Sequence, residues 1–131
     1  MITRGARGPR LGLAAVALLA CALAVPAADA HAVLVRSSPS HRAVLAQAPE
    51  RVELWFNERL EPAYSTVSVW SDAGGQVDAR DVAVTTDDPR RLSVSLTTRA
   101  AGLYTVKYRV LSVDGHVVDS RITFTVKGQK P

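Results

Sequence analysis

A strict alternation of apolar and polar residues recurs along the chain after residue 50 and constrains its fold more than any other feature. In Arg51-Val-Glu-Leu-Trp-Phe-Asn57, the side chains of Val52, Leu54 and Phe56 share one side of an extended chain. The same period of two recurs in the runs 65–70, 91–97, 104–110 and 122–126. Because side chains alternate between the two faces of a β-strand, each run predicts a strand with one buried face.

Turn-forming residues separate these runs, at 61–62, 72–75, 87–89, 101–102 and 114–115. Two shorter extended stretches, 32–36 and 76–84, raise the total to about seven strands at the spacing of a β-sandwich. The only segment with helical character is 42–47, which is too short to organise a fold. We therefore predict an all-β, Greek-key sandwich that is immunoglobulin-like in architecture.

The first 30 residues have the organisation of a secretory signal peptide. Three arginines and no acid precede the uncharged apolar run 11–25, and Ala28-Asp29-Ala30 places small residues where a signal peptidase reads them. The apolar run is shorter than the roughly 20 residues of a membrane span. We expect cleavage after Ala30, which makes 31–131 the mature domain, with His31 first. The alternative is a lipoprotein: Leu18-Leu19-Ala20-Cys21 resembles the motif in which the cysteine carries the lipid.

Removal of the leader changes what the composition means. Residues 31–131 hold 13 Lys and Arg against 11 Asp and Glu, a net charge of +2, and neither cysteine nor methionine. This excludes a disulfide framework, a thiolate zinc site and a thioether metal site. A charge of +2 without a basic stripe argues against nucleic-acid binding. No nucleophile–base motif or phosphate-binding glycine loop supports hydrolase or kinase chemistry.

His31 can chelate a metal if it is the first residue of the mature chain. Its α-amine and ring Nδ1 would close a six-membered chelate, and the reference pKa of an α-amine, about 7.7–8.0, lets a metal displace its proton near neutral pH. A second imidazole would complete three nitrogens, a donor set that suits Cu(II). Without a second imidazole, a histidine at this position reflects only where the leader ends and does not indicate a metal site.

Asp114 and His116 are two residues apart across Gly115, in a predicted turn between the last two strands. Gly115 permits backbone angles that bring the carboxylate and imidazole together, and a carboxylate beside a metal-bound histidine either ligates or orients the ring. Taken alone, Asp-Gly is also a common hairpin turn, with His116 then a surface residue.

Four other residues lie outside the strand pattern. Glu58 follows a strand and, on its own, is a solvated charge. His41 lies in a polar loop, where we expect a surface residue. Trp55 and Trp70 face away from the inferred core, and either cover a second layer or form an interaction patch.

Four segments of the chain can be compared with known families: His31-Ala-Val-Leu-Val-Arg-Ser-Ser-Pro39, Val52-Glu-Leu-Trp-Phe-Asn-Glu58, the run from Gly102 to Ser-Val-Asp-Gly-His116, and Phe124-Thr-Val126. Taken together and in this order, they resemble the CopC family of copper-resistance proteins. The resemblance spans nearly all of residues 31–128. The chain departs from the family pattern in two ways. It has Val117 where members often have proline, and residues 31–131 lack the methionines that form a Cu(I) site in some members.

The resemblance implies an exported, Greek-key protein that binds one Cu(II) ion as a carrier or buffer, outside the cytoplasmic membrane. It implies that His31 chelates through its amine and ring, that His116 supplies a third nitrogen and that Asp114 provides an oxygen. Glu58 falls where some members have a further carboxylate. It also implies delivery to an inner-membrane protein of the CopD type. We expect a monomer and no enzymatic activity.

Two other functions fit parts of the sequence. Lytic polysaccharide monooxygenases use a similar N-terminal histidine on a β-sandwich, but they are generally larger and need open copper positions. The other alternative is an interaction sandwich that binds no metal.

Overall fold

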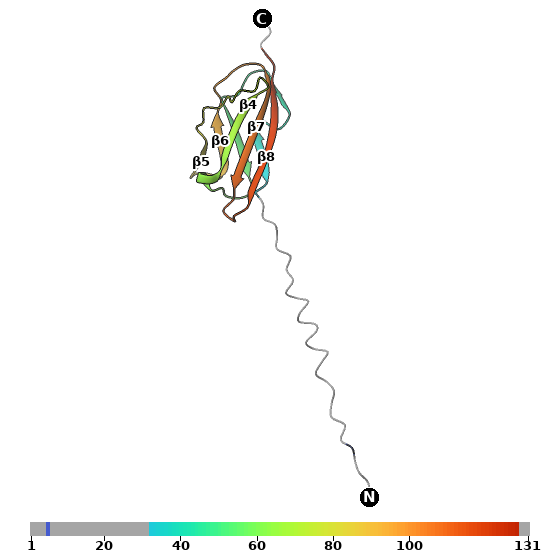
Figure 1. Cartoon of the computed structure of the whole chain (residues 1–131), viewed down its shortest axis with the longest axis vertical. Coiled ribbons are helices and arrows are strands. Elements are labelled where there is room, and N and C mark those ends of the chain that lie inside the picture. The colour runs from blue at the N-terminus through green and yellow to red at the C-terminus, as the bar shows by residue number, and fades with distance from the viewer. Residues whose placement is uncertain (1–4, 6–31, 129–131) are drawn as a thin grey trace.

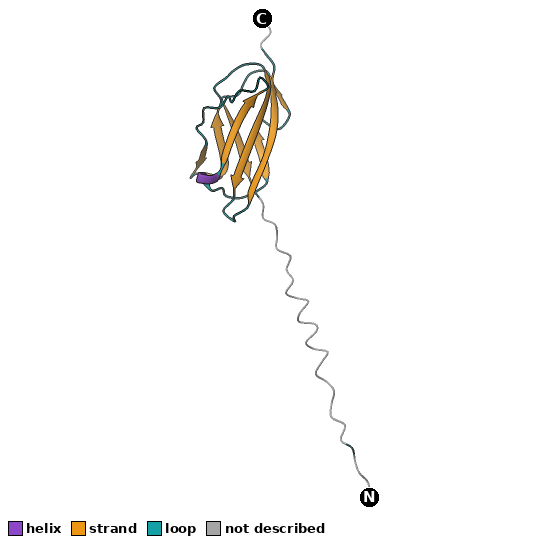
Figure 2. Cartoon of the chain, in the orientation of Figure 1, coloured by secondary structure: helices purple, strands orange, loops and turns teal. Residues whose placement is uncertain are grey.

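The strands form two four-stranded sheets packed face to face (Figures 1 and 2). The computed structural model describes residue 5 and residues 32–128, so the leader and His31 lie outside the described residues. One sheet has the order β1-β3-β6-β5, and the other has the order β2-β8-β7-β4. In the first sheet β1 is Leu34–Ser38, β3 Arg51–Phe56, β5 Ala83–Thr85 and β6 Asp88–Ser95. In the second, β2 is Ala43–Leu45, β4 Thr66–Ser71, β7 Gly102–Leu111 and β8 Val117–Val126.

This strand order is that of an immunoglobulin-type sandwich and confirms the predicted fold class. The first sheet corresponds to strands A, B, E and D, and the second to strands C, F and G with a short added strand beside G. Tyr104, near the start of β7, donates a hydrogen bond from its hydroxyl to the carbonyl of Ala100 at 2.5 Å. A tyrosine at this position, bonded back to the chain upstream, is a recurrent feature of such sandwiches.

The period of two correctly predicts which side chains form the core. The apolar side chains of β3, β6, β7 and β8 that alternate inward are almost completely buried, except for the partly buried Val118, and so are Val67 and Val69 of β4. Phe56 of the first sheet meets Tyr108 of the second edge-on, with ring centroids 5.5 Å apart, and within the second sheet Tyr104 stacks on its cross-strand neighbour Phe124 at 5.1 Å. A chain without disulfides thus depends on this apolar burial for its stability.

Three local predictions are wrong. Segment 42–47 is not helical, because residues 43–45 form β2, which pairs in parallel with residues 124–126. Segment 76–84 is not one strand: only 83–85 is, and the residues before it are held by single bridges to Trp70 and Leu96. β6 starts at Asp88, inside the turn expected at 87–89. The structure also contains one 3₁₀ turn, Pro62–Tyr64. Eight strands result, rather than about seven.

The two tryptophans lie on the outer faces of the sheets, each beside a cation. The Arg36 guanidinium lies 3.8 Å from the centroid of the Trp55 ring, and the Lys107 ammonium lies 5.2 Å from that of Trp70. Trp70 also donates from Nε1 to the Ser68 hydroxyl at 2.9 Å. Within the part of the chain that the structure describes, no helix is long and apolar enough to span a membrane.

Candidate metal centre

The turn between β7 and β8, residues 112–116, brings a carboxylate and an imidazole together. Ser112 N–H donates to the His116 carbonyl at 3.0 Å, and Gly115 N–H donates to the Ser112 carbonyl at 2.9 Å. Gly115 has φ +92°, a conformation that side-chain-bearing residues rarely adopt, although space around it is open. The requirement for glycine is therefore one of backbone conformation.

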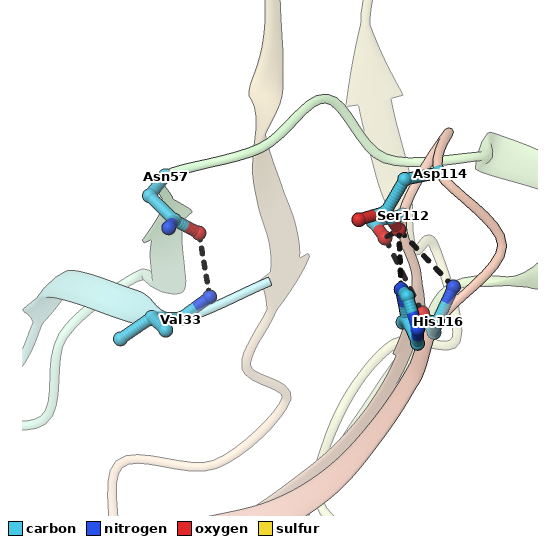
Figure 3. Close-up of polar contacts among 5 residues, drawn as sticks. All are labelled: Val33, Asn57, Ser112, Asp114 and His116. Atoms are coloured by element: carbon cyan, nitrogen blue, oxygen red, sulfur yellow. Dashed lines mark hydrogen bonds and ion pairs between the residues drawn. The ribbon is translucent and has the colours of Figure 1, made fainter. Parts of the chain in front are cut away.

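Asp114 holds the turn through a single carboxylate oxygen (Figure 3). Its Oδ1 accepts a hydrogen bond from the Ser112 hydroxyl and another from His116 N–H at 3.1 Å. The same Oδ1 lies 3.3 Å from His116 Nδ1. Every polar contact of Asp114 with the described residues uses Oδ1, so Oδ2 makes none there.

The pKa of Asp114 is lowered from its ordinary value. The main cause is the hydrogen bond from the buried Ser112 hydroxyl, and the main-chain and ring contacts with His116 act in the same direction. Hydrogen bonds to the charged form stabilise it, so Asp114 is a carboxylate at neutral pH. The turn therefore carries a negative oxygen beside a ring nitrogen.

The start of the described domain is anchored at the same end of the sandwich (Figure 1). Ala32 is only 1% exposed. Val33 N–H donates to Asn57 Oδ1 at 2.6 Å, and Asn57 N–H donates to the Val33 carbonyl at 3.0 Å (Figure 3). Two residues further, the Arg59 carbonyl accepts from Val113 N–H at 3.0 Å. The loop after β3 thus connects the residues that follow His31 to the turn that holds Asp114 and His116.

Of the predicted site residues, the structure brings Asp114 and His116 together. Glu58 is half-buried in the loop between Asn57 and Arg59. Among residues 5 and 32–128, no group of three or more His, Cys, Asp or Glu side chains is arranged to hold a metal, so Glu58 does not join that pair in such a group. His31, the other predicted donor, lies outside the described residues.

His41 is an exposed loop residue with a structural contact. Its Nδ1 accepts a hydrogen bond from Thr123 N–H at 3.1 Å. Thr123 lies seven positions beyond His116 along β8, which corresponds to about 23 Å of strand. His41 therefore lies beside the C-terminal half of β8, away from the turn that holds Asp114.

Two residues of this region were not recognised from the sequence as having roles. Ser112 orients Asp114, and Asn57 anchors Val33. Ser112 could have been found, because a hydroxyl two residues before an aspartate in a turn is a common hydrogen-bond donor to it. Asn57 could not, because its partner is 24 residues away along the chain.

These features define a class: an immunoglobulin-like sandwich with a carboxylate–histidine turn at the end where the domain begins. The CopC domain model matches residues 34–127. The chain belongs to the CopC family.

Known relatives support this membership. The crystal structure of CopC from Methylosinus trichosporium OB3b is 39% identical, with a TM-score of 0.72 over 77% of this chain and 98% of that one. Copper resistance protein C of Xanthomonas campestris pv. juglandis is 33% identical over 127 residues, covering 86% of this chain and 92% of the relative. Copper transport protein CutJ of Bacillus subtilis is 32% identical over 98 residues, or 74% of this chain, but the match spans only 18% of CutJ.

Proposed function

We propose that this chain is an exported Cu(II)-binding protein that carries or buffers one copper ion outside the cytoplasmic membrane. The observation that carries the proposal is the turn in which Asp114 and His116 lie side by side, at the end where the domain begins. The relatives named for copper resistance and copper transport support the same metal. Signal-peptide cleavage after Ala30 would place His31 at this end as the first residue.

The donor set consists of the His31 amine and Nδ1, His116 Nε2 and an oxygen of Asp114. His116 Nδ1 faces Asp114 Oδ1 at 3.3 Å, so Nε2 is the nitrogen on the other side of the ring. A metal-binding histidine commonly donates its second ring N–H to a carboxylate, which orients the ring. A metal on Nε2 lies on the far side of the ring from this contact, so Asp114 must turn away from Nδ1 to bring an oxygen to the same ion. Glu58 is proposed as a further carboxylate near the ion.

This donor set favours Cu(II) over Cu(I). Cu(I) prefers soft sulfur ligands, whereas Cu(II) is suited by tetragonal nitrogen and oxygen donors. Residues 31–131 contain neither cysteine nor methionine. We therefore propose a carrier for the oxidised ion, without enzymatic activity, and an inner-membrane protein of the CopD type as its recipient.

The decisive test compares two proteins that differ at the N-terminus alone. One begins at His31, and the other carries a single glycine before it, which removes the α-amine from the chelate. Competition titrations against a chelator should show much weaker Cu(II) binding for the extended protein. Equal affinity of the two would rule out the N-terminal chelate.

Two further measurements separate this function from the alternatives. His116→Ala should weaken Cu(II) binding in the protein that begins at His31, whereas the matched change His41→Ala, in the loop between β1 and β2, should leave it unchanged. Mass spectrometry of the exported protein should find His31 at the N-terminus. A lipid-bearing Cys21 would contradict the proposal.

A further inference from the structure

The two edges of β8 are unequal. Along one edge, all residues of Val117–Val126 pair with β7 (Figure 1). Along the other edge, only residues 124–126 pair, with β2. Among the described residues, nothing bonds to the main chain of 117–122 on that side. This open edge, defined as residues 117–122, starts directly after His116.

The register shows which main-chain groups point to the open edge. Thr123 N–H donates to His41 Nδ1, and the Thr123 carbonyl accepts from Arg42 N–H at 2.7 Å, so both Thr123 groups point away from β7. In an antiparallel pair this direction alternates along the strand. The N–H and carbonyl groups of Val117, Asp119 and Arg121 therefore point to the open edge.

The opposite edge of the same sheet is covered. There, Val77 N–H donates to the Val69 carbonyl at 2.8 Å, and Ser71 N–H donates to the Gly75 carbonyl at 2.9 Å. Asp78 Oδ2 accepts from Val69 N–H at 2.8 Å. Unpaired strand edges are templates for pairing with another chain, and proteins usually cover them. This sheet is covered at Val69 and Ser71 of β4 and open beside the candidate metal centre.

The outer face of β7 and β8 beside the open edge carries an excess of positive charge, Lys107, Arg109 and Arg121 against Asp119. Lys107 of β7 lies directly opposite Arg121 of β8, and two like charges in this position repel. The nearby acid, Asp119, is paired with Arg109 at 3.4 Å. Neither Lys107 nor Arg121 has a carboxylate partner among the described residues. Lys107, Asp119, Ser120 and Arg121 line a hollow of about 400 Å³.

We propose that the open edge of β8 binds an extended, acidic segment of a partner protein, which adds a strand to the sheet. The main-chain groups of Val117, Asp119 and Arg121 supply the hydrogen bonds, and Arg121 at the edge, with Lys107 on the neighbouring strand β7, favours acidic side chains. The added strand would lie about 4.8 Å from β8 and end beside His116. Val117, 48% exposed, provides apolar contact there.

This inference rests on the proposed function only in naming the partner, a protein that exchanges copper with this one. Peptide binding is measured on copper-free protein. It can therefore fail while copper binding stands, and it can succeed if His31 proves not to chelate.

The experiment uses the exported protein labelled with ¹⁵N and a capped peptide of alternating threonine and glutamate. Hydrogen exchange by NMR should show the amides of Asp119 and Arg121 exchanging fast in the free protein and slowly with peptide bound. The amide of Ser120, which bonds to β7, should be protected in both. Protection at 119 and 121 distinguishes strand addition from loose electrostatic attraction.

Two controls test the charge match. The double variant Lys107→Glu/Arg121→Glu should bind the acidic peptide about tenfold more weakly, whereas Arg90→Glu/Arg99→Glu, the same charge change at exposed positions elsewhere, should not. A peptide of alternating threonine and lysine should not bind. Absence of binding would overturn the proposal and leave Asp119 and Arg121 as charges that merely discourage pairing at the edge. Binding without protection, or stronger attraction to anionic lipid vesicles, would overturn it too.

Discussion

Two aspartates organise turns in this domain, and they use their oxygens differently. Asp78, 7% exposed, accepts from Val69 N–H and the Gln76 side chain through Oδ2, and from Arg80 N–H at 2.9 Å through Oδ1. Asp114 concentrates its contacts on Oδ1, and its side chain is 26% exposed. A carboxylate with both oxygens engaged inside the fold serves structure, whereas one with an oxygen left over can also bind a ligand. The comparison predicts that Asp78 matters for stability and Asp114 for copper.

The largest effect should come from Asp78→Ala. It leaves the N–H of Val69, a fully buried residue of β4, without its acceptor. We expect a loss of about 2–4 kcal/mol in the free energy of unfolding, measured by urea denaturation. Copper binding per folded molecule should be unchanged. Asp78→Asn, which keeps an acceptor oxygen, should cost less, and an equal cost would show that charge rather than the hydrogen bond dominates.

Asp114→Asn should reverse that pattern. The substitution removes the negative oxygen beside His116, so Cu(II) affinity should fall about 10–100-fold in competition titrations. The free energy of unfolding should change by no more than about 1 kcal/mol, because the turn is exposed. Asp119→Asn is the matched control, since it removes an exposed carboxylate from the following strand and should leave copper affinity unchanged. If Asp114→Asn destabilised the fold as much as Asp78→Ala, the proposed division between a structural and a ligand-binding aspartate would be wrong.

Ser112→Ala should have a smaller effect on copper, because Ser112 acts on the metal only through Asp114. Loss of the hydroxyl frees the carboxylate to rotate, and we expect Cu(II) affinity to fall about threefold to tenfold. Ser112 is 1% exposed, so its loss should also cost about 1 kcal/mol of stability. An affinity loss as large as that of Asp114→Asn would mean that Ser112 itself approaches the metal.

Local patterns predicted one of these two aspartates and not the other. Asp114 is predicted because its partner His116 is only two residues away, across Gly115. Asp78 is not, because its role depends on Val69, in a strand that only the folded chain brings alongside. The buried core residues could be predicted for the same reason as Asp114, because the alternating pattern that marks them lies within a few residues of each.

Segments whose structure depends on distant partners were predicted poorly. β2 has three residues, too few to show a period, and it is a strand because it pairs with residues 124–126. The sequence predicts a strand before β5, but there Gln76 and Asp78 form only single bridges, to Trp70 of β4 and to Leu96. Long-range pairing of this kind leaves no local pattern to read.

The smallest effect concerns the protonation of Asp114. Its folded-state pKa is lowered, so its carboxylate stabilises the fold above the ordinary value of 3.8, and this contribution is lost as pH falls through the lowered pKa. Carboxyl NMR should give a midpoint below 3.8 in copper-free protein, and Ser112→Ala should move it upward. Acid should release copper as protons displace the metal from the imidazole and amine nitrogens, which bind it only when they are deprotonated. Release that tracked the Asp114 midpoint instead would make the carboxylate, rather than the nitrogens, the principal donor.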